Sequence, residues 1–197
     1  MGPVHHGKHR NPEDLDSYIA RMEDPERAAW QKPDEVLRAL ELAPGQVACD
    51  IGAGPGYFAL RMARTAAQVF AVDVEPRILQ ALIKRIVKSG LRNVTPVFAV
   101  DDDPLIPAGA CDLILVANTY HHFPDGPAYL RRLAHSLKPG GRIANIDFHK
   151  RELPVGPPVE HKVARDGFLA DGSAAGLDLV AEHDFLPYQY FLVLRPR

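Results

Sequence analysis

The chain has 197 residues, of which 46% are hydrophobic and 24% are charged. This length and near-average composition suit one compact domain with its own core, and they exclude a disordered, collagen-like or coiled-coil chain. The formal net charge of −2 gives no general basic field, so neither nucleic acid nor an anionic membrane is an expected partner. We therefore expect the partner to be a small molecule, with the protein acting as a monomer or homodimer.

The two cysteines, Cys49 and Cys111, each lie in an apolar stretch. We expect both to be buried free thiols, because they make no disulfide framework and lack the spacing of a zinc site. No stretch approaches the roughly 18 apolar residues of a membrane span, and residues 1–11 lack the apolar run of a secretory signal. A cytoplasmic location without a bound metal is the prediction.

Residues 1–45 are polar and interrupted by prolines, unlike the rest of the chain. Residues 1–12 carry His5, His6 and His9 without apolar periodicity, and we assign them no function. Helix-start signals then predict three short helices that begin near residues 12, 25 and 33. We expect this segment to be a tail and helical cap, not an independent domain, on a second region at residues 46–197.

From residue 46 onwards, short apolar runs alternate with helical stretches, which is the pattern of a parallel sheet with crossover helices. The predicted strands cover residues 47–51, 69–74, 94–100, 111–117, 142–148, 177–185 and 189–194. The predicted helices cover residues 57–67, 76–89, 127–137 and 162–176. A tight turn at residues 138–141 leads into the fifth strand, and the last two strands are close enough in sequence to pair antiparallel.

The first predicted strand ends in a glycine-rich turn, residues 50–56 (DIGAGPG). Glycines at a strand-to-helix turn let the backbone pass close to a ligand. The dinucleotide pattern G-x-G-x-x-G is not matched, because Tyr57 stands where its third glycine belongs. A cofactor with an amino-acid end instead needs a carboxylate for its ammonium group and amides for its own carboxylate. The candidate cofactor residues in this turn are Asp50, Gly52, Ala53, Gly54 and Gly56.

Further acidic residues follow the next two strands. Asp73 closes the second strand 21 residues after the first glycine, where a carboxylate accepts both hydroxyls of a ribose. After the third strand, one aspartate of residues 101–103 is placed to accept the exocyclic amine of adenine, with Leu105 or Ile106 against the ring. The candidate cofactor residues here are Asp73, Val74, Asp101 and Asp102, and which aspartate meets the amine is open.

Together these motifs resemble those of the class I S-adenosylmethionine-dependent methyltransferases, in particular the small-molecule branch with ubiquinone-biosynthesis enzymes. The resemblance covers about residues 33–150. It rests on residues 47–57 (VACDIGAGPGY), 69–76 (VFAVDVEP), 111–123 (CDLILVANTYHHF) and 137–143 (LKPGGRI). It implies an α/β, Rossmann-like, doubly wound seven-stranded sheet in the order 3-2-1-4-5-7-6, with strand seven antiparallel.

The resemblance also implies the place of the site. The strand order reverses between strands one and four, so the ligand crevice opens there and residues 50–56 face residues 118–122. The implied cofactor is S-adenosyl-L-methionine, with S-adenosyl-L-homocysteine as its product. Asn118 is expected to touch the cofactor through its backbone or its amide.

Methyl transfer mainly requires alignment of donor and acceptor, and a base is needed only when the acceptor atom must lose a proton. His121 and His122 follow the fourth strand and are the candidate catalytic residues, because histidine titrates near neutral pH. The alternative is a helix-start histidine bonded to the backbone.

Five residues are candidates for binding the acceptor. Asp147 and His149 share one face of the fifth strand at its crevice end, with solvated strand-end residues as the alternative. The other three are Tyr18 in the cap, Tyr120 after the fourth strand and Tyr188 near the last hairpin, with core packing as the alternative. Tyr18, together with Arg21, Trp30 and Gln31, forms a possible lid that excludes water.

The sequence therefore predicts transfer of a methyl group to an O, S, N or C atom of a small molecule. Residues 118–121 (NTYH) replace the Asn/Asp-Pro-Pro-Tyr/Phe element of enzymes that methylate amino groups and adenine. Arsenic methylation lacks accessible cysteines, and metal-dependent catechol methylation lacks a carboxylate cluster after the fourth strand. Two alternatives stay open: a protein that binds the cofactor without methyl transfer, and an NAD-linked enzyme.

Overall fold

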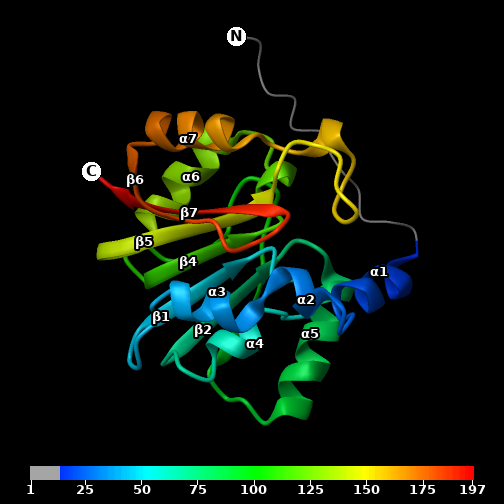
Figure 1. Cartoon of the computed structure of the whole chain (residues 1–197). Coiled ribbons are helices and arrows are strands. Elements are labelled where there is room, and N and C mark those ends of the chain that lie inside the picture. Colours follow the sequence, from blue (N-terminus) through cyan, green and yellow to red (C-terminus); the bar gives the residue numbers. More distant parts are fainter. Residues whose placement is uncertain (1–13) are drawn as a thin grey trace.

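The computed structural model describes residues 14–197, so His5, His6 and His9 lie outside the described residues. The described chain forms a seven-stranded sheet with helices on both faces (Figure 1). The strands are β1 Val47–Ile51, β2 Gln68–Asp73, β3 Val94–Phe98, β4 Cys111–Ala117, β5 Leu137–Phe148, β6 Leu177–His183 and β7 Gln189–Pro196. Their order, β3-β2-β1-β4-β5-β7-β6, is the predicted one, and β7 is antiparallel to both neighbours, as predicted.

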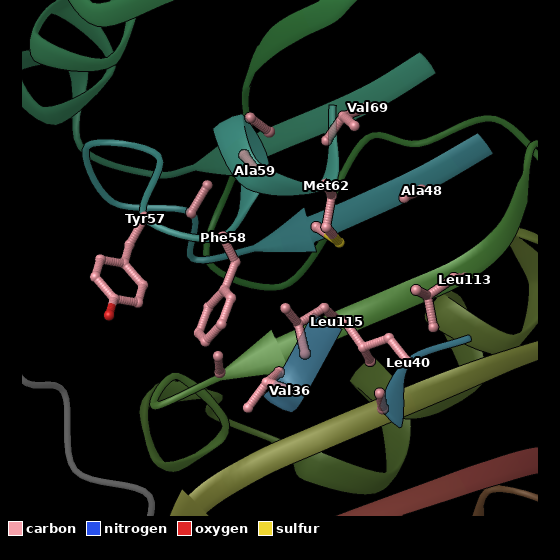
Figure 2. Close-up of a cluster of buried hydrophobic side chains, with 14 of the residues drawn as sticks. Val36, Leu40, Ala48, Tyr57, Phe58, Ala59, Met62, Val69, Leu113 and Leu115 are labelled. Atoms are coloured by element: carbon pink, nitrogen blue, oxygen red, sulfur yellow. The ribbon is translucent and has the colours of Figure 1, made fainter. Parts of the chain in front are cut away.

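The helices separate into two layers, each with its own buried cluster. The α-helices are α1 Leu15–Met22, α2 Arg27–Gln31, α3 Pro33–Ala39, α4 Ala59–Met62, α5 Pro76–Ser89, α6 Gly126–His135 and α7 Arg165–Ala174. Two 3-10 helices, η1 Tyr120–His122 and η2 Val159–His161, complete them. Val36, Phe58 and Leu115 belong to the cluster that joins α3, α4 and α5 to one face of the sheet (Figure 2). The cluster on the other face joins the sheet to α6 and α7.

The helix predicted at residues 57–67 is much shorter in the structure, where α4 spans only Ala59–Met62. Two kinds of backbone hydrogen bond occur around it. Leu60 N donates to Gly56 O, four residues back, whereas Arg61 N donates to Phe58 O, three residues back. The residues on either side of α4 therefore form successive turns, and only one regular helical turn follows the glycine-rich residues.

The fifth strand begins five residues earlier than predicted. β5 includes residues 138–141, and its register against β4 shifts between the Cys111–Leu137 and Leu113–Arg142 pairs. The glycines thus form a bulge inside a strand instead of a turn before it. The other boundaries in residues 46–197 differ from the prediction by up to three residues.

The N-terminal helices are tied to the sheet domain by α5. Asp16 and Glu23 of the cap form ion pairs with Arg77 (3.8 Å) and Arg85 (3.2 Å). Arg85 also donates to Pro55 O in the glycine-rich turn, at 2.9 Å. The cap helices α1 and α2 therefore dock beside this turn (Figure 1). That the cap is no domain of its own stays a prediction.

Both cysteines are fully buried free thiols, as predicted. Cys49 lies on β1 and Cys111 at the start of β4, on neighbouring strands. Burial raises the pKa of the Cys49 thiol. A buried neutral thiol contributes packing and offers no nucleophile to solvent.

Replacing Gly52 by Ala is expected to destabilise the fold by about 1–3 kcal/mol. Gly52 has φ +68°, and an added Cβ would overlap the side chain of Thr119. Gly90→Ala is the matched control, because Gly90 has φ +70° with open space around it. Chemical denaturation should show a larger loss for Gly52→Ala than for Gly90→Ala. Equal losses would mean that backbone conformation alone, and not the contact with Thr119, requires the glycine.

Candidate active site

The glycine-rich turn brings the ends of three strands together. Gly52, Gly54 and Gly56 all have left-handed φ values, of +68°, +56° and +91°. These backbone conformations bring the turn against the end of β2, where Gly54 N donates to Asp73 Oδ2 at 3.0 Å. Because Gly52 lies directly against Thr119, the turn meets the segment that follows β4. This contact confirms that residues 50–56 face residues 118–122.

Two buried carboxyl groups flank the turn. Asp50, at 2% exposure, accepts the backbone amide of Ala59. Burial raises the pKa of the Asp50 carboxyl to about 7, although Arg27 acts in the opposite direction. Asp73 accepts backbone amides on both oxygens, from Gly54 and Glu75, and burial raises its pKa too. The backbone amide of Val74 also bonds this carboxyl, which with about four lone-pair sites keeps acceptor capacity for a ligand hydroxyl.

The three aspartates after β3 are not equivalent. Arg132 of α6 pairs with Asp102 at 3.6 Å and with Asp103 at 2.8 Å, and Asp103 also accepts the amide of Leu105. Asp101 is exposed and makes no ion pair within the described residues. Of the two predicted residues, Asp101 and Asp102, the first is therefore the better candidate for an adenine amine. Val74, which follows Asp73, and Leu105, four residues after Asp101, have exposed fractions of 44% and 53% and present apolar surface.

A histidine and a carboxylate meet at the ends of β4 and β5. His121 Nδ1 lies 3.1 Å from Asp147 Oδ2, with the two side chains 6% and 0% exposed. Asp147 Oδ1 accepts the amide of Phe148 at 2.8 Å. Because a carboxylate only accepts, Nδ1 donates and Nε2 of His121 carries the free lone pair. Asp147 is therefore buried against His121, and its predicted contact with the acceptor stays a prediction.

The remaining predicted residues fall in different places. His122 is exposed, with its ring centre 4.2 Å from that of His121. His149 is half-buried beside Tyr190, its amide donates to Tyr188 O, and burial lowers its pKa. Tyr188 is half-buried at the same end of the sheet. His149 and Tyr188 are thus adjacent, and both stay candidates for acceptor binding.

Tyr120, a predicted acceptor-binding residue, lies in the interior. Its ring is fully buried, 4.7 Å between centres from Phe168 of α7, and its hydroxyl donates to Asp171 at 2.7 Å. Burial raises the pKa of this hydroxyl. Tyr120 therefore packs η1 against α7, and its buried ring is not accessible from solvent.

Three buried or half-buried amides form a closed ring that the sequence did not reveal. Gln31 donates to Gln189 (2.8 Å), Gln189 donates to Asn118, and Asn118 donates to Gln31 (3.1 Å). Each side-chain amide donates a hydrogen bond to one neighbour and accepts one from the other, so the orientation of all three is fixed. The ring joins α2 of the cap to the ends of β4 and β7. Since the side-chain amide of Asn118 is used here and its backbone N–H donates to Ile146 O, its backbone carbonyl is the group left for the predicted cofactor contact.

Cap residues cover the turn from the other side. A Cβ on Gly54 would lie 3.1 Å from Met22 Sδ. Tyr18 is half-buried; burial is the first cause that raises the pKa of its hydroxyl, and the charge of Asp73 is the second. Trp30 lies with its ring centre 5.7 Å from that of Phe148, next to Asp147 in β5. Of the predicted lid residues, Trp30 therefore packs against the end of β5, and Tyr18 lies within the electrostatic influence of Asp73.

Within residues 14–197, no group of three or more His, Cys, Asp or Glu side chains is arranged to hold a metal ion. None of the helices in this range is long and apolar enough to cross a membrane.

Known proteins similar to this chain are methyltransferases. A family model described as a methyltransferase domain matches residues 48–141. The fold also matches a solved S-adenosylmethionine-dependent methyltransferase from Aquifex aeolicus, with a TM-score of 0.85 and 25% identity over 90% of this chain and 96% of that one. In sequence and in fold, this chain is similar to the class I S-adenosylmethionine-dependent methyltransferases.

Curated relatives of this chain include ubiquinone biosynthesis O-methyltransferases. One from Xanthomonas euvesicatoria pv. vesicatoria is 35% identical over 108 residues, or 55% of this chain and 45% of the relative. One from Xanthomonas oryzae pv. oryzae is 33% identical over 110 residues, or 56% and 46%. The chain thus spans about half the length of the curated relatives it matches. A solved cyclase, SpnF, shares the fold alone, at 18% identity and a TM-score of 0.74 over 98% of this chain and 88% of that one.

The residues of the candidate site fit S-adenosylmethionine. The cofactor offers an ammonium group, two ribose hydroxyls and an adenine ring. Asp50 would hold the ammonium group, Asp73 the hydroxyls, and Val74 with Asp101 the adenine. The fit rests on the unused lone pairs of two buried carboxyl groups and on the exposed apolar surface of Val74.

Binding of S-adenosylhomocysteine is expected to strengthen as the pH rises toward 7. The pKa of Asp50 is about 7, and only its ionised form attracts an ammonium group. Below pH 7 the affinity should therefore fall by up to about tenfold per pH unit, and above it the affinity should level off. Calorimetry between pH 5.5 and 8 measures this slope. The Asp50→Asn variant should bind S-adenosylhomocysteine more weakly, and its affinity should not depend on pH in this way. The same pH dependence in Asp50→Asn as in the wild type would contradict the role of Asp50.

Proposed function

We propose that this protein transfers a methyl group from S-adenosylmethionine to a hydroxyl group of a small molecule, with His121 as the general base. The observation that carries the proposal is the buried hydrogen bond from His121 to Asp147, at the strand ends that face the glycine-rich turn. A base is useful when the acceptor is a phenol or alcohol, which must lose its proton. The names of the curated relatives, O-methyltransferases, support a hydroxyl acceptor.

In this proposal the cofactor supplies, when bound, a methyl group on a positively charged sulfur. Asp147 keeps the His121 proton on Nδ1 and fixes the ring, so that Nε2 faces the acceptor. Nε2 takes the hydroxyl proton, and Asp147 stabilises the imidazolium that results. The remaining rate acceleration comes from the alignment of donor and acceptor, since a methyl transfer is an in-line displacement between positioned groups.

The cap contributes by excluding water. The ring formed by Gln31, Asn118 and Gln189 holds α2 against the sheet, and Trp30 covers Phe148. His149 and Tyr188, next to the end of β5, are the residues proposed to contact the acceptor. A site closed in this way suits a small molecule better than a nucleic acid.

A cytoplasmic location is part of the proposal. Support comes from Cys49 and Cys111, which are buried as free thiols on neighbouring strands. Such thiols are usual in proteins of reducing compartments.

The test is methyl transfer from labelled S-adenosylmethionine to a panel of phenols, catechols, alcohols, thiols and amines. We expect a product heavier by one methyl group on a hydroxyl acceptor, formed together with an equal amount of S-adenosylhomocysteine. Transfer to thiols or amines but to no hydroxyl would overturn the choice of acceptor. Tight cofactor binding without transfer to any acceptor would favour the alternative, a binding protein.

A further inference from the structure

The segment that connects β5 to α7, coloured yellow in Figure 1, is fixed at both of its ends. At its start, His149 N donates to Tyr188 O at 3.0 Å, and Arg151 N donates to His149 O at 2.8 Å. From its end, the ammonium group of Lys162 donates to Arg151 O, also at 2.8 Å. Lys162 therefore joins the first residues of this segment to the last ones before α7.

Lys162 is a buried cation without a described anion beside it. It is 2% exposed, and within residues 14–197 it forms no ion pair with a carboxylate. Its ammonium group has three donors, and Arg151 O is the acceptor that the described part of the chain provides. The Phe148 ring centre lies 5.9 Å from Nζ, at the outer limit of a cation–π contact. Because a buried charge is costly unless it is paired, Lys162 indicates an anionic ligand.

A pocket of about 400 Å³ lies between the two stretches that Lys162 joins. The residues that line it are His149, Lys150, Arg151, Ala164 and Arg165. None of these lining residues is acidic, and none is among those assigned to the cofactor. His149 comes two positions after Asp147 in the chain, a step of at most about 7 Å. The pocket is therefore close to the carboxylate that holds His121, on the side of the proposed acceptor.

The charges around this pocket are not balanced. Arg165 is occupied by acidic neighbours, since it donates to Glu182 at 2.7 Å and to Asp166 at 2.8 Å. Lys150 and Arg151 are exposed, and neither forms an ion pair with another described residue. These two cations and the buried ammonium group therefore favour an oxyanion, which accepts hydrogen bonds from all three.

We propose that this pocket binds a carboxylate or phosphate group of the acceptor, with Lys150, Arg151 and Lys162 as the cations that recognise it. The inference rests on the proposed function, because it takes the ligand to be the molecule that is methylated. It narrows the substrate class to a hydroxylated small molecule that also carries an oxyanion. Arg151 can bind such a group through two parallel donors, and Lys162 supplies the buried charge.

The oxyanion site is tested with inorganic phosphate and the whole chain, by NMR titration. Phosphate should shift the backbone amides of residues 149–151 and 162–165 with one common affinity. Lys162→Met should weaken this binding at least about tenfold, and Arg151→Met, which changes an exposed side chain, should weaken it too. Lys88→Met is the matched control, because Lys88 is an exposed lysine on α5, and it should leave the affinity unchanged. The site is refuted if these amides do not shift, or if Lys162→Met and Arg151→Met bind phosphate like the wild type.

The source of the anion is tested with pairs of hydroxyl acceptors that differ only in charge, such as a hydroxyphenylacetate and the amide of the same acid. The wild type should have a kcat/KM about 10- to 100-fold higher with the acid, and Lys162→Met should lose this preference without a change in the rate with the amide. Phosphate binding without a preference for charged acceptors would mean that the pocket holds free anions only, against the proposal.

The two experiments separate this inference from the proposed function. If no acceptor is methylated, the proposed function fails, whereas the phosphate titration still decides whether the oxyanion site exists. Should Lys162→Met lose its thermal transition, Arg151→Met takes its place in both experiments, and Lys162→Arg should keep both the fold and the phosphate binding.

Discussion

Replacing Asp73 by Asn should weaken binding of S-adenosylhomocysteine about 30- to 100-fold, the largest loss of affinity we expect from a single substitution. Asp73 ends β2 and is proposed to accept both ribose hydroxyls while its oxygens also accept the amides of Gly54 and Glu75. Asn keeps the size but loses the charge and one acceptor. Loss of two charge-assisted hydrogen bonds amounts to about 2–3 kcal/mol.

Calorimetry at neutral pH measures this loss. Asp102→Asn serves as the control, because Arg132 engages Asp102 on the α6 side, and its affinity should stay within about twofold of the wild type. A melting curve for each variant checks that the turn still folds. An affinity of Asp73→Asn equal to that of the control would remove Asp73 from the cofactor site.

Replacing His121 by Gln should lower kcat about 10²- to 10⁴-fold on a hydroxyl acceptor, with the affinity for S-adenosylhomocysteine unchanged. Gln keeps hydrogen bonding toward Asp147 but cannot take a proton. Asp147→Asn should also lower kcat and change the pH profile, because the amide no longer holds the Nδ1 proton as a carboxylate does.

The comparison with His122 decides which histidine acts. His122 is exposed, and its ring lies against that of His121, so His122→Gln should retain most of the activity. A loss for His122→Gln as large as that for His121→Gln would contradict a specific base at His121. So would an unchanged pH profile in both His121→Gln and Asp147→Asn.

The fold was predictable because its central strands have one simple pattern. β1 and β4 are buried on both faces, so they appear as continuous apolar runs, and their predicted boundaries are correct. β5 was predicted five residues too short because Gly140 and Gly141 are typical of a turn, and only pairing with β4 makes them a bulge. The short α4 also escaped prediction, because residues 57–67 are as apolar and helix-compatible as a regular helix.

The candidate site was predictable where its residues follow strand ends at fixed spacing. Asp50 and Asp73 are of this kind, and the structure places both beside the glycine turn. Tyr120 also follows a strand end, but sequence does not tell which face an aromatic ring takes, and here it packs on α7.

Contacts between residues far apart in the chain were out of reach. His121 and Asp147 were both singled out, but their hydrogen bond depends on the register of β4 with β5. Gln31 and Gln189 are 158 residues apart and meet only through the docking of the cap. Arg27 carried no motif, and its position over the Tyr57 ring, 3.9 Å from the ring centre, is visible only in the folded chain.

The most direct measurement of cofactor choice is calorimetric titration of the whole chain with S-adenosylhomocysteine and, separately, with NAD. We expect one binding site per chain for S-adenosylhomocysteine and no measurable binding of NAD, because Tyr57 interrupts the dinucleotide pattern. Absence of S-adenosylhomocysteine binding, or tighter binding of NAD, would contradict the role of the glycine-rich turn as a site for S-adenosylmethionine.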